Sequence, residues 1–223
     1  MKNINLNNIK LVIFDVDGTL YDQSKLRKKM LVELIRYYLF KPWRFKDLLI
    51  VYHFRKEREK KAGQQINNLQ EEQFKWCAAK INVPLNRIKE VVDKWIFKFP
   101  IKYLKESAYP DVNYFFSKLK ENGVLTAIYS DYDSKLKLDS MNLSANLLVS
   151  STDENINAMK PLPDGLNYIL AKLNIEDKGK CLFIGDRQEL DGICAERAGI
   201  PFLLIDNDNA NDNFYKSLSN KLA

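Results

Sequence analysis

Residues 11–20, LVIFDVDGTL, decide the fold of this chain. The first four residues form an unbroken apolar run, which predicts a strand buried on both faces in the middle of a parallel sheet. Asp15 and Asp17 follow at once, and their spacing of two places both carboxylates on one side of the chain if the extended geometry continues. Open α/β sheets bind their ligands beyond the carboxyl ends of such strands. We therefore interpret this pair of acids as a candidate catalytic site.

The carboxyl-terminal half of the chain alternates strands with helices. Apolar strands are expected at 124–129, 147–150, 181–184 and 202–205. Amphipathic helices are expected at 110–122, 134–141, 163–173 and 189–198, and a short last helix follows the Asn/Asp-rich loop 206–213. Repeated βα units of this kind predict a parallel sheet with right-handed crossovers. The fold class is therefore α/β, with a Rossmann-like, doubly wound and mostly parallel sheet.

A helical segment interrupts this alternation directly after the first strand. Helices are expected at 25–40, 43–61, 69–81 and 84–97, with Pro100 closing the segment. Four helices without an intervening strand do not continue a βα pattern. We predict an inserted all-α domain over 21–105 and an α/β core made of 1–20 and 106–223.

Further polar residues stand where the predicted core elements begin or end. Ser130 ends the strand at 124–129, Gly185 and Asp186 end the strand at 181–184, and Lys160 precedes a helix in the string MKPLP. Taken one at a time these signals are weak, because serines after strands usually serve in turns and lysines are usually solvated. Because all of them are expected at the same edge of the sheet, together they indicate a functional site more strongly than any one of them does.

The segment 15–20, DVDGTL, resembles the first motif, DxDGT(L/V), of the haloacid dehalogenase-like (HAD) superfamily, most of whose members are magnesium-dependent phosphatases. Ser130, Lys160 and the acidic run 185–192, GDRQELDG, resemble the second, third and fourth motifs of that superfamily in the right order. The insert resembles, in position and helical content, the helical cap that many members carry between the first two motifs.

The resemblance implies a role for each matching residue. Asp15 would be the nucleophile that takes the phosphoryl group as an aspartyl phosphate, and Asp17 would be the general acid and base. The Ser130 hydroxyl and the backbone amide of Asp131 would bind phosphate oxygens, while the Asp131 side chain caps the next helix. Lys160 would neutralise the charge shared by the nucleophile and the phosphate.

The same resemblance implies Mg²⁺ as the cofactor. This ion prefers six oxygen ligands and retains several waters, so it needs few protein ligands. Those ligands would be the carboxylates of Asp15 and Asp186 and the backbone carbonyl of Asp17. Asp191 is expected beside them, orienting a water or the motif lysine. Glu189 competes for that last role, and the sequence leaves the choice open.

Charge divides unevenly between the two predicted domains. The chain carries a formal charge of +6, whereas residues 21–105 alone carry +12 and the remainder −6. Basic residues alternate with aromatic ones in 37–46, YYLFKPWRFK. Three interpretations stay open: the insert focuses an acidic phosphorylated substrate, it contacts an anionic membrane or polymer, or its charges only solvate a helical surface. No motif resembles a nucleic-acid reader, so no nucleic-acid partner is expected.

The composition of the 223 residues is that of a soluble globular protein, with 46% hydrophobic and 29% charged residues. No apolar run reaches the roughly 18 residues of a membrane span, and the first residues lack the apolar core of a secretory signal, so we expect a cytoplasmic protein. Cys77, Cys181 and Cys194 lack zinc-ligand spacing and are expected to be free, mostly buried thiols. The single histidine, His53, excludes mechanisms that need several imidazoles.

These observations favour magnesium-dependent hydrolysis of a small phosphate monoester. Asp17 argues against hydrolytic dehalogenation, which needs no general acid two residues after the nucleophile. A phosphomutase or a phosphonate hydrolase remains an alternative, because those activities depend on residues of the insert. A binding protein that uses the basic insert with little catalysis is a further alternative, although the presence of every motif acid and of the lysine favours an enzyme. The sequence leaves the oligomeric state open.

Overall fold

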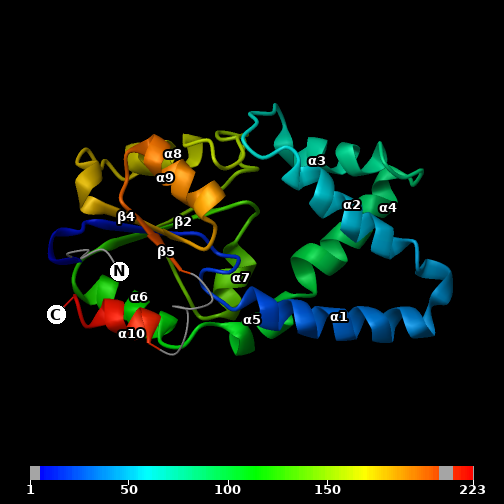
Figure 1. The fold of residues 1–223 in the computed structure, drawn as a ribbon, viewed down its shortest axis with the longest axis horizontal. Helices are drawn as coiled ribbons and strands as arrows, with labels where there is room; N and C mark the ends of the chain where they lie inside the picture. The colour runs from blue at the N-terminus through cyan, green and yellow to red at the C-terminus, as the bar shows by residue number, and fades with distance from the viewer. Residues whose placement is uncertain (1–5, 206–212, 223) are drawn as a thin grey trace.

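The computed structural model describes residues 6–205 and 213–222, and its centre is a five-stranded sheet with helices on both faces (Figure 1). The strands are β1 (Leu11–Phe14), β2 (Leu125–Ser130), β3 (Leu147–Ser150), β4 (Cys181–Gly185) and β5 (Phe202–Leu204). They lie in the order β3-β2-β1-β4-β5, and every neighbouring pair is parallel. The predicted α/β class and the central place of β1 are confirmed. The sheet, expected to be mostly parallel, is parallel throughout.

Alternate residues of β1 enter two separate apolar layers, one on each face of the sheet. Leu11 and Ile13 pack on the face covered by α8 (Asp164–Lys172) and α9 (Ile193–Ala198). Val12 and Phe14 pack on the face covered by α6 (Val112–Glu121), α7 (Lys135–Ser140) and α10 (Phe214–Ser219). All four side chains are fully buried. This two-sided burial explains why the sequence of β1 is apolar without alternation.

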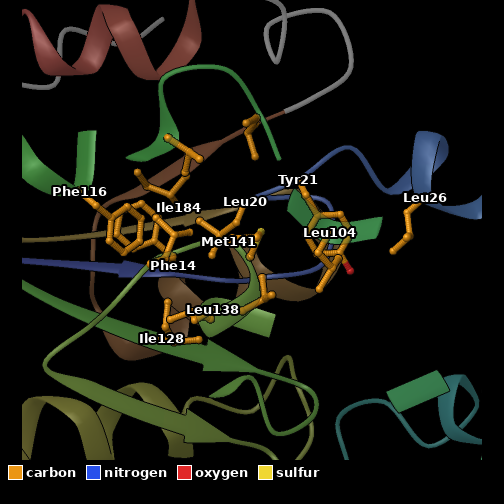
Figure 2. Close-up of a cluster of buried hydrophobic side chains, with 14 of the residues drawn as sticks. Phe14, Leu20, Tyr21, Leu26, Leu104, Phe116, Ile128, Leu138, Met141 and Ile184 are labelled. Atoms are coloured by element: carbon orange, nitrogen blue, oxygen red, sulfur yellow. The ribbon is translucent and has the colours of Figure 1, made fainter. Parts of the chain in front are cut away.

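The layer on the α6 side continues beyond the sheet. The ring of Phe14 stacks on that of Phe116 with 4.6 Å between the ring centroids. Figure 2 shows Ile184 beside this pair, Leu20 near the middle of the same cluster, and Leu104 and Leu26 toward its other end. The core therefore extends without a break from the central strand to the point where the chain leaves the sheet.

The regular elements between β1 and α6 are all helical. These are α1 (Gln23–Phe40), the 3₁₀ turn η2 (Pro42–Arg44), α2 (Asp47–Glu59), α3 (Leu69–Ala78), α4 (Leu85–Val92), the π-helical turn η3 (Asp93–Lys98) and α5 (Ile101–Ser107). We call residues 23–107 the helical lobe. In Figure 1 it lies beside the sheet, with α1 as its longest helix. The division of the chain into two domains at 20/21 and 105/106 stays a prediction.

Two details of the lobe differ from the sequence-based expectation. The helix expected over 84–97 is α4 followed directly by the π-helical turn η3. Helix α5 was not expected, because Pro100 looked like the end of the helical segment. Pro100 in fact stands immediately before the first residue of α5, a position where the missing N–H of proline leaves no helical hydrogen bond unmade.

The chain enters and leaves the helical lobe through two segments that lie side by side. The backbone N–H of Asp22 donates to the carbonyl of Ser107 at 2.8 Å, and that of Tyr109 donates to the carbonyl of Leu20 at 3.1 Å. A second connection joins the loop after α2 to the segment before α8. Gly63 N–H donates to the carbonyl of Lys160 at 2.9 Å. The lobe therefore touches the core at the very loop that carries the predicted motif lysine.

The remaining elements are short. A 3₁₀ turn η1 (Leu6–Asn8) precedes β1, and another, η4 (Lys178–Lys180), precedes β4. The helix expected over 189–198 begins as the π-helical turn η5 (Gln188–Gly192) and continues as α9. The Asn/Asp-rich loop lies, apart from its last residue, outside the described residues, and α10 confirms the expected last helix. The three cysteines are free and buried, and no described helix has the length and apolarity needed to cross a membrane.

Candidate active site

Asp15 lies just past the carboxyl end of β1 and is buried, with 7% of its surface exposed. Its backbone N–H donates to the carbonyl of Ile184 at 2.9 Å, which continues the parallel pairing with β4. Its Oδ1 accepts a hydrogen bond from Lys160 Nζ at 2.7 Å, and its Oδ2 accepts one from Thr19 Oγ1 at 3.3 Å. Both carboxylate oxygens are therefore held in place by polar neighbours.

Lys160 connects Asp15 to the fourth motif. Lys160 is 3% exposed, and its Nζ donates a second hydrogen bond, of 2.8 Å, to Asp191 Oδ1. The other carboxylate oxygen of Asp191 accepts from the backbone N–H of Arg187 at 3.1 Å. Residues more than a hundred positions apart in the sequence thus meet at one edge of the sheet, as the strand-end argument predicted.

Three carboxylates surround this single lysine. Oxygens of Asp15, Asp186 and Asp191 all lie within 4.8 Å of one another. Burial raises the pKa of Asp15 well above its usual range; Lys160 opposes the rise, while Asp191 and Asp186 add to it. Burial, reinforced by Asp191 and opposed by Lys160, raises the pKa of Asp186 to about 7. Two buried acids and a half-buried one with a single buried cation favour a bound divalent ion, and the oxygen donors are those that Mg²⁺ prefers.

Two glycines make this approach of carboxylates possible. Gly18 has φ of +92°, and a Cβ atom there would lie 2.1 Å from Asp186 Oδ2. A Cβ on Gly185 would lie 2.6 Å from Asp191 Oδ2. Any side chain at either position would displace an acid of the cluster. The glycines in the strings DG and GD are therefore required by packing at the site.

Asp17 lines the same cavity as Asp15 but binds a different set of partners. Tyr21 Oη donates to Asp17 Oδ1 at 2.5 Å, and Lys137 of α7 forms an ion pair with the same oxygen. Burial alone would raise the pKa of Asp17, but Lys137 and the Tyr21 hydroxyl lower it on balance. The Asp17 carboxylate is therefore charged in this arrangement, and it borders the cavity.

Ser130 and Asp131 follow β2 and line the cavity. Ser130 is buried, and among the described residues its hydroxyl has no hydrogen-bond partner, which leaves it available to a ligand. The prediction that the Asp131 side chain caps the next helix is wrong. Asp133 supplies that contact, because its Oδ1 accepts from the N–H of Lys135 at 2.9 Å. The Asp131 carboxylate faces Ser151 Oγ at 3.5 Å instead.

The carboxylates of Asp191 and Glu189, between which the sequence left the choice open, lie in different places. Asp191 is buried and belongs to the acidic cluster. Glu189 is on the surface, where its Oε1 accepts from Arg187 Nε at 2.9 Å. Asp191 alone of the two lies within reach of the motif lysine.

A cavity of about 810 Å³ joins these residues to the helical lobe. The acids, Ser130 and Lys160 border it from the core. The lobe contributes the arginines Arg27, Arg55 and Arg58 together with apolar side chains that include Met30, Leu34, Trp95 and Phe97. The core wall of the cavity is thus mainly ionic, whereas the lobe wall combines apolar surface with arginines.

Three residues at this cavity were not predicted from the sequence: Lys137, Tyr21 and Arg58. Arg58 is 4% exposed; its Nη2 donates to the carbonyl of Asp131 at 2.5 Å, and its guanidinium lies over the ring of Tyr132. A signal was available only for Lys137. It stands in the first turn of the helix after β2, so its side chain begins near the same sheet edge as Ser130.

Comparison with known families agrees with this geometry. The family model described as haloacid dehalogenase-like hydrolase matches residues 12–205. The chain belongs to the HAD hydrolases. The resemblance noted from the motifs of the core is therefore confirmed. No curated protein sequence matches this HAD hydrolase significantly.

Solved structures share its fold. An HAD phosphatase from Thermococcus onnurineus matches with a TM-score of 0.58 and 20% identity, over 88% of this chain and 86% of that one. A 2-haloacid dehalogenase from Pseudomonas syringae pv. Tomato DC3000 matches with a TM-score of 0.61 and 16% identity, over 95% and 99%. A phosphonoacetaldehyde hydrolase-like protein from Oleispira antarctica gives 0.57 and 15%, over 99% and 86%. At these identities the likeness establishes a common fold, and the chemistry must be argued from the site.

Proposed function

We propose that this HAD hydrolase is a Mg²⁺-dependent phosphatase that hydrolyses a small phosphate monoester through an aspartyl phosphate on Asp15. One observation carries the proposal. The buried Asp15 carboxylate is hydrogen-bonded to Lys160 and clusters with two further acids, while the separate Asp17 carboxylate borders the same cavity. A nucleophile, a fixed positive charge, a place for a divalent cation and a second acid are the groups that phosphoryl transfer to water requires.

In the first half of the reaction, a carboxylate oxygen of Asp15 attacks phosphorus and the bond to the leaving oxygen breaks. Lys160 stabilises the charge that Asp15 and the phosphoryl oxygens share, since its Nζ already contacts Asp15. The free hydroxyl of Ser130 and the backbone amide of Asp131 bind phosphoryl oxygens on the opposite side. Asp191 keeps Lys160 oriented through their 2.8 Å hydrogen bond.

Asp17 moves the protons. It donates one to the leaving oxygen, and in the second half it takes one from the water that attacks phosphorus and releases phosphate from Asp15. Its contacts with Tyr21 and Lys137 keep it charged before substrate binds. The proton that Asp17 passes to the leaving oxygen must therefore come from an acidic phosphate oxygen of the substrate, and loss of the Lys137 contact as substrate enters would favour its transfer to Asp17.

Mg²⁺ fits the residues that are present. The carboxylates of Asp15 and Asp186 and the backbone carbonyl of Asp17 would hold it, with Asp191 beside them. When bound, the ion supplies positive charge to the phosphoryl oxygens. The excess of buried carboxylates over buried cations is the structural reason to expect it.

We further propose that the helical lobe acts as a cap that selects the substrate. It contributes the wall of the cavity opposite the acids, including Arg55 and Trp95. Its loop at Gly63 is hydrogen-bonded to the backbone of Lys160, so a movement of the lobe would displace the segment that carries this lysine. The predicted boundary of this cap, 21–105, is close to the extent of the lobe.

The test is hydrolysis of para-nitrophenyl phosphate by the wild type, with Mg²⁺ and with a chelator, compared with Asp15→Asn. Asp139→Asn is the matched control, because Asp139 is an exposed acid of α7 that pairs with Lys135 at the surface. Activity that requires Mg²⁺, survives in the control and disappears in Asp15→Asn supports the proposal. Turnover that persists in Asp15→Asn contradicts it. Chloride release from a chlorinated carboxylic acid without phosphate release would identify a dehalogenase instead.

A further inference from the structure

A group of large apolar side chains is exposed at the tip of the helical lobe. They come from the end of α1, from η2 and from the start of α2, which turn at an end of the lobe remote from the sheet (Figure 1). Their exposed fractions run from 51% to 77%. We call them the tip patch: Ile35, Leu39, Phe40, Trp43, Phe45 and Leu49. Monomeric proteins rarely expose so much apolar surface in one place without a binding role.

This exposure is concentrated in one segment. Of the eleven large apolar side chains that are exposed among the described residues, nine lie between positions 31 and 52, and only Tyr114 and Leu136 lie elsewhere. Beneath the patch, the interior of the lobe is already filled by buried aromatic side chains. Tyr38 and Trp95 are buried with 6.0 Å between their ring centroids, and the ring of Phe45 lies against Tyr38 from the outside. The tip patch is therefore an outward surface of a filled core.

The exposed charged side chains between positions 35 and 49 are all basic, and one of them, Arg36, lies 3.8 Å from Glu33 just outside this range. Arg36, Lys41 and Lys46 are exposed among its residues. The single acid between positions 35 and 49 is Asp47, which is buried and accepts a 2.5 Å hydrogen bond from Arg87 Nη2. The exposed surface of this segment thus offers apolar groups and cations, with no exposed carboxylate to compete for them.

We propose that the tip patch binds the surface of an anionic lipid membrane. Its aliphatic and aromatic side chains enter the interface between headgroups and acyl chains, while Arg36, Lys41 and Lys46 contact anionic headgroups. A second copy of the chain would bring the same cations against these, so self-association through this face is disfavoured. A polyanion would match the charge but leave the apolar side chains in water. An anionic lipid surface satisfies both observations.

This inference goes beyond the proposed phosphatase and is independent of it. No residue of the tip patch borders the active-site cavity. Membrane binding can therefore be measured and removed without altering the catalytic groups. A bound lobe would hold the catalytic core at the surface of the membrane by peripheral contact.

The test is flotation of the full chain with vesicles of phosphatidylcholine, alone or with about 30% phosphatidylglycerol. We expect the wild type to float with the anionic vesicles and to partition at least about tenfold more weakly onto the neutral ones. The emission of Trp43, the most exposed tryptophan, should shift to the blue on binding. Trp43→Phe should remove most of that shift while it preserves flotation.

The decisive variant is the triple substitution Leu39→Ser, Phe40→Ser and Trp43→Ser, which should lower partition onto anionic vesicles at least about tenfold. Its control is Tyr114→Ser with Leu136→Ser, since these are exposed apolar residues of the core outside the patch. Circular dichroism and hydrolysis of para-nitrophenyl phosphate check that both variants are folded. Lys41→Gln with Lys46→Gln should remove the preference for anionic lipid, and Lys120→Gln with Lys172→Gln should not.

Three results would overturn the proposal. The first is wild-type protein that does not float with anionic vesicles. The second is flotation that the triple variant retains. The third is a concentration-dependent dimer that the triple variant abolishes while vesicle binding is absent, because this would assign the tip patch to a second copy of the chain.

Discussion

The two walls of the active-site cavity differ in how their charged groups are held. On the core wall, Asp15, Lys160 and Asp191 are buried, and Lys160 is hydrogen-bonded to both acids. Asp15 and Lys160 lie in connecting segments and Asp191 in η5, all at one edge of the sheet. On the lobe wall, the cavity is bordered by apolar side chains and by arginines such as Arg55, which is exposed. The charged groups of the core wall are held in place by their hydrogen bonds. On the lobe wall, Arg58 is buried, but Arg27 and Arg55 are exposed beside a large apolar area.

This difference separates two tasks. Buried, mutually bonded charges are preorganised, so they can stabilise charge that develops at a reacting atom without first reorganising. Exposed arginines on a helical surface attract an anion in its ground state and its transition state alike. The comparison predicts that substitutions on the core wall lower kcat, while substitutions on the lobe wall raise KM. The variants below test that separation.

Lys160→Met should have the largest effect. It removes the cation that both Asp15 and Asp191 contact, so we expect kcat to fall about a thousandfold at saturating Mg²⁺. The metal-free protein should also lose about 3–5 kcal/mol of unfolding free energy, because buried carboxylates remain without their partner. Hydrolysis of para-nitrophenyl phosphate and urea unfolding with a chelator measure the two effects.

Adding Asp191→Asn to Lys160→Met separates structure from catalysis. The double variant buries one negative charge fewer, so it should recover part of the lost stability. Its activity should stay low, because the charge next to Asp15 is still missing. Recovery of kcat in the double variant would show that Lys160 serves only to balance the buried acids.

Asp17→Asn should produce a loss that depends on the leaving group. An alkoxide needs a proton as it departs, so kcat/KM for an alkyl phosphate should fall about 10²–10⁴-fold. The para-nitrophenolate ion leaves without a proton, so kcat/KM for its ester should fall much less. Asp22→Asn is the matched control, since Asp22 lies in the same loop but caps α1 through the N–H of Lys25. Equal losses for the two esters would remove Asp17 from the role of general acid.

The sequence predicted the core wall well because its signals are local. An apolar run that stops at a polar residue marks the end of a buried strand, and parallel strands end at a common edge. That reasoning placed Asp15, Ser130 and Asp186 at one site. The lysine before α8 joined them through its motif context. For Lys160, which does not follow a strand, the resemblance to the third motif was needed as well.

The lobe side and the partners of Asp17 could not be predicted in the same way. Lys137 looks like any lysine near the start of a surface helix, and its burial depends on an acid 120 residues earlier in the chain. Arg58 is one of many basic residues of the lobe, and only its fold shows that it is buried against Asp131. The side chain of Asp131 was misplaced because Asp133, two residues later, is equally able to cap the same turn. Such choices depend on tertiary contacts between elements.

Asp186 should make both metal affinity and stability depend on pH. Burial and Asp191 raise its folded pKa from 3.8 to about 7, so the metal-free fold retains a proton that the unfolded chain loses at lower pH. This contribution to stability is complete below about pH 4 and disappears as pH rises through about 7. Mg²⁺ competes with the same proton, so the Mg²⁺ concentration for half-maximal activity should rise up to about tenfold per pH unit below 7.

Urea unfolding with a chelator from about pH 5 to pH 8 measures the first effect, and Mg²⁺ titrations of activity at each pH measure the second. Asp186→Asn removes the titrating group, so the stability of the metal-free variant should vary less across this range. The exposed acid Asp139, replaced by Asn, should leave the profile of the wild type unchanged. If the unfolding free energy of Asp186→Asn changes with pH as steeply as that of the wild type, the titrating proton belongs to another group of the cluster.

Arg55→Gln should have the smallest effect and tests the lobe wall directly. Arg55 is exposed, lines the cavity and lies close enough to Asp17 to favour its charged form. Because its attraction for a phosphate is the same before and during reaction, we expect KM to rise about three- to tenfold while kcat changes less than about twofold. Steady-state kinetics with para-nitrophenyl phosphate measure both constants. Arg36→Gln is the control, since Arg36 is an exposed arginine of α1 that does not line the cavity, and its KM should match the wild type. A fall in kcat in Arg55→Gln without a change in KM would mean that the lobe takes part in the chemical step, and the separation between the two walls would be wrong.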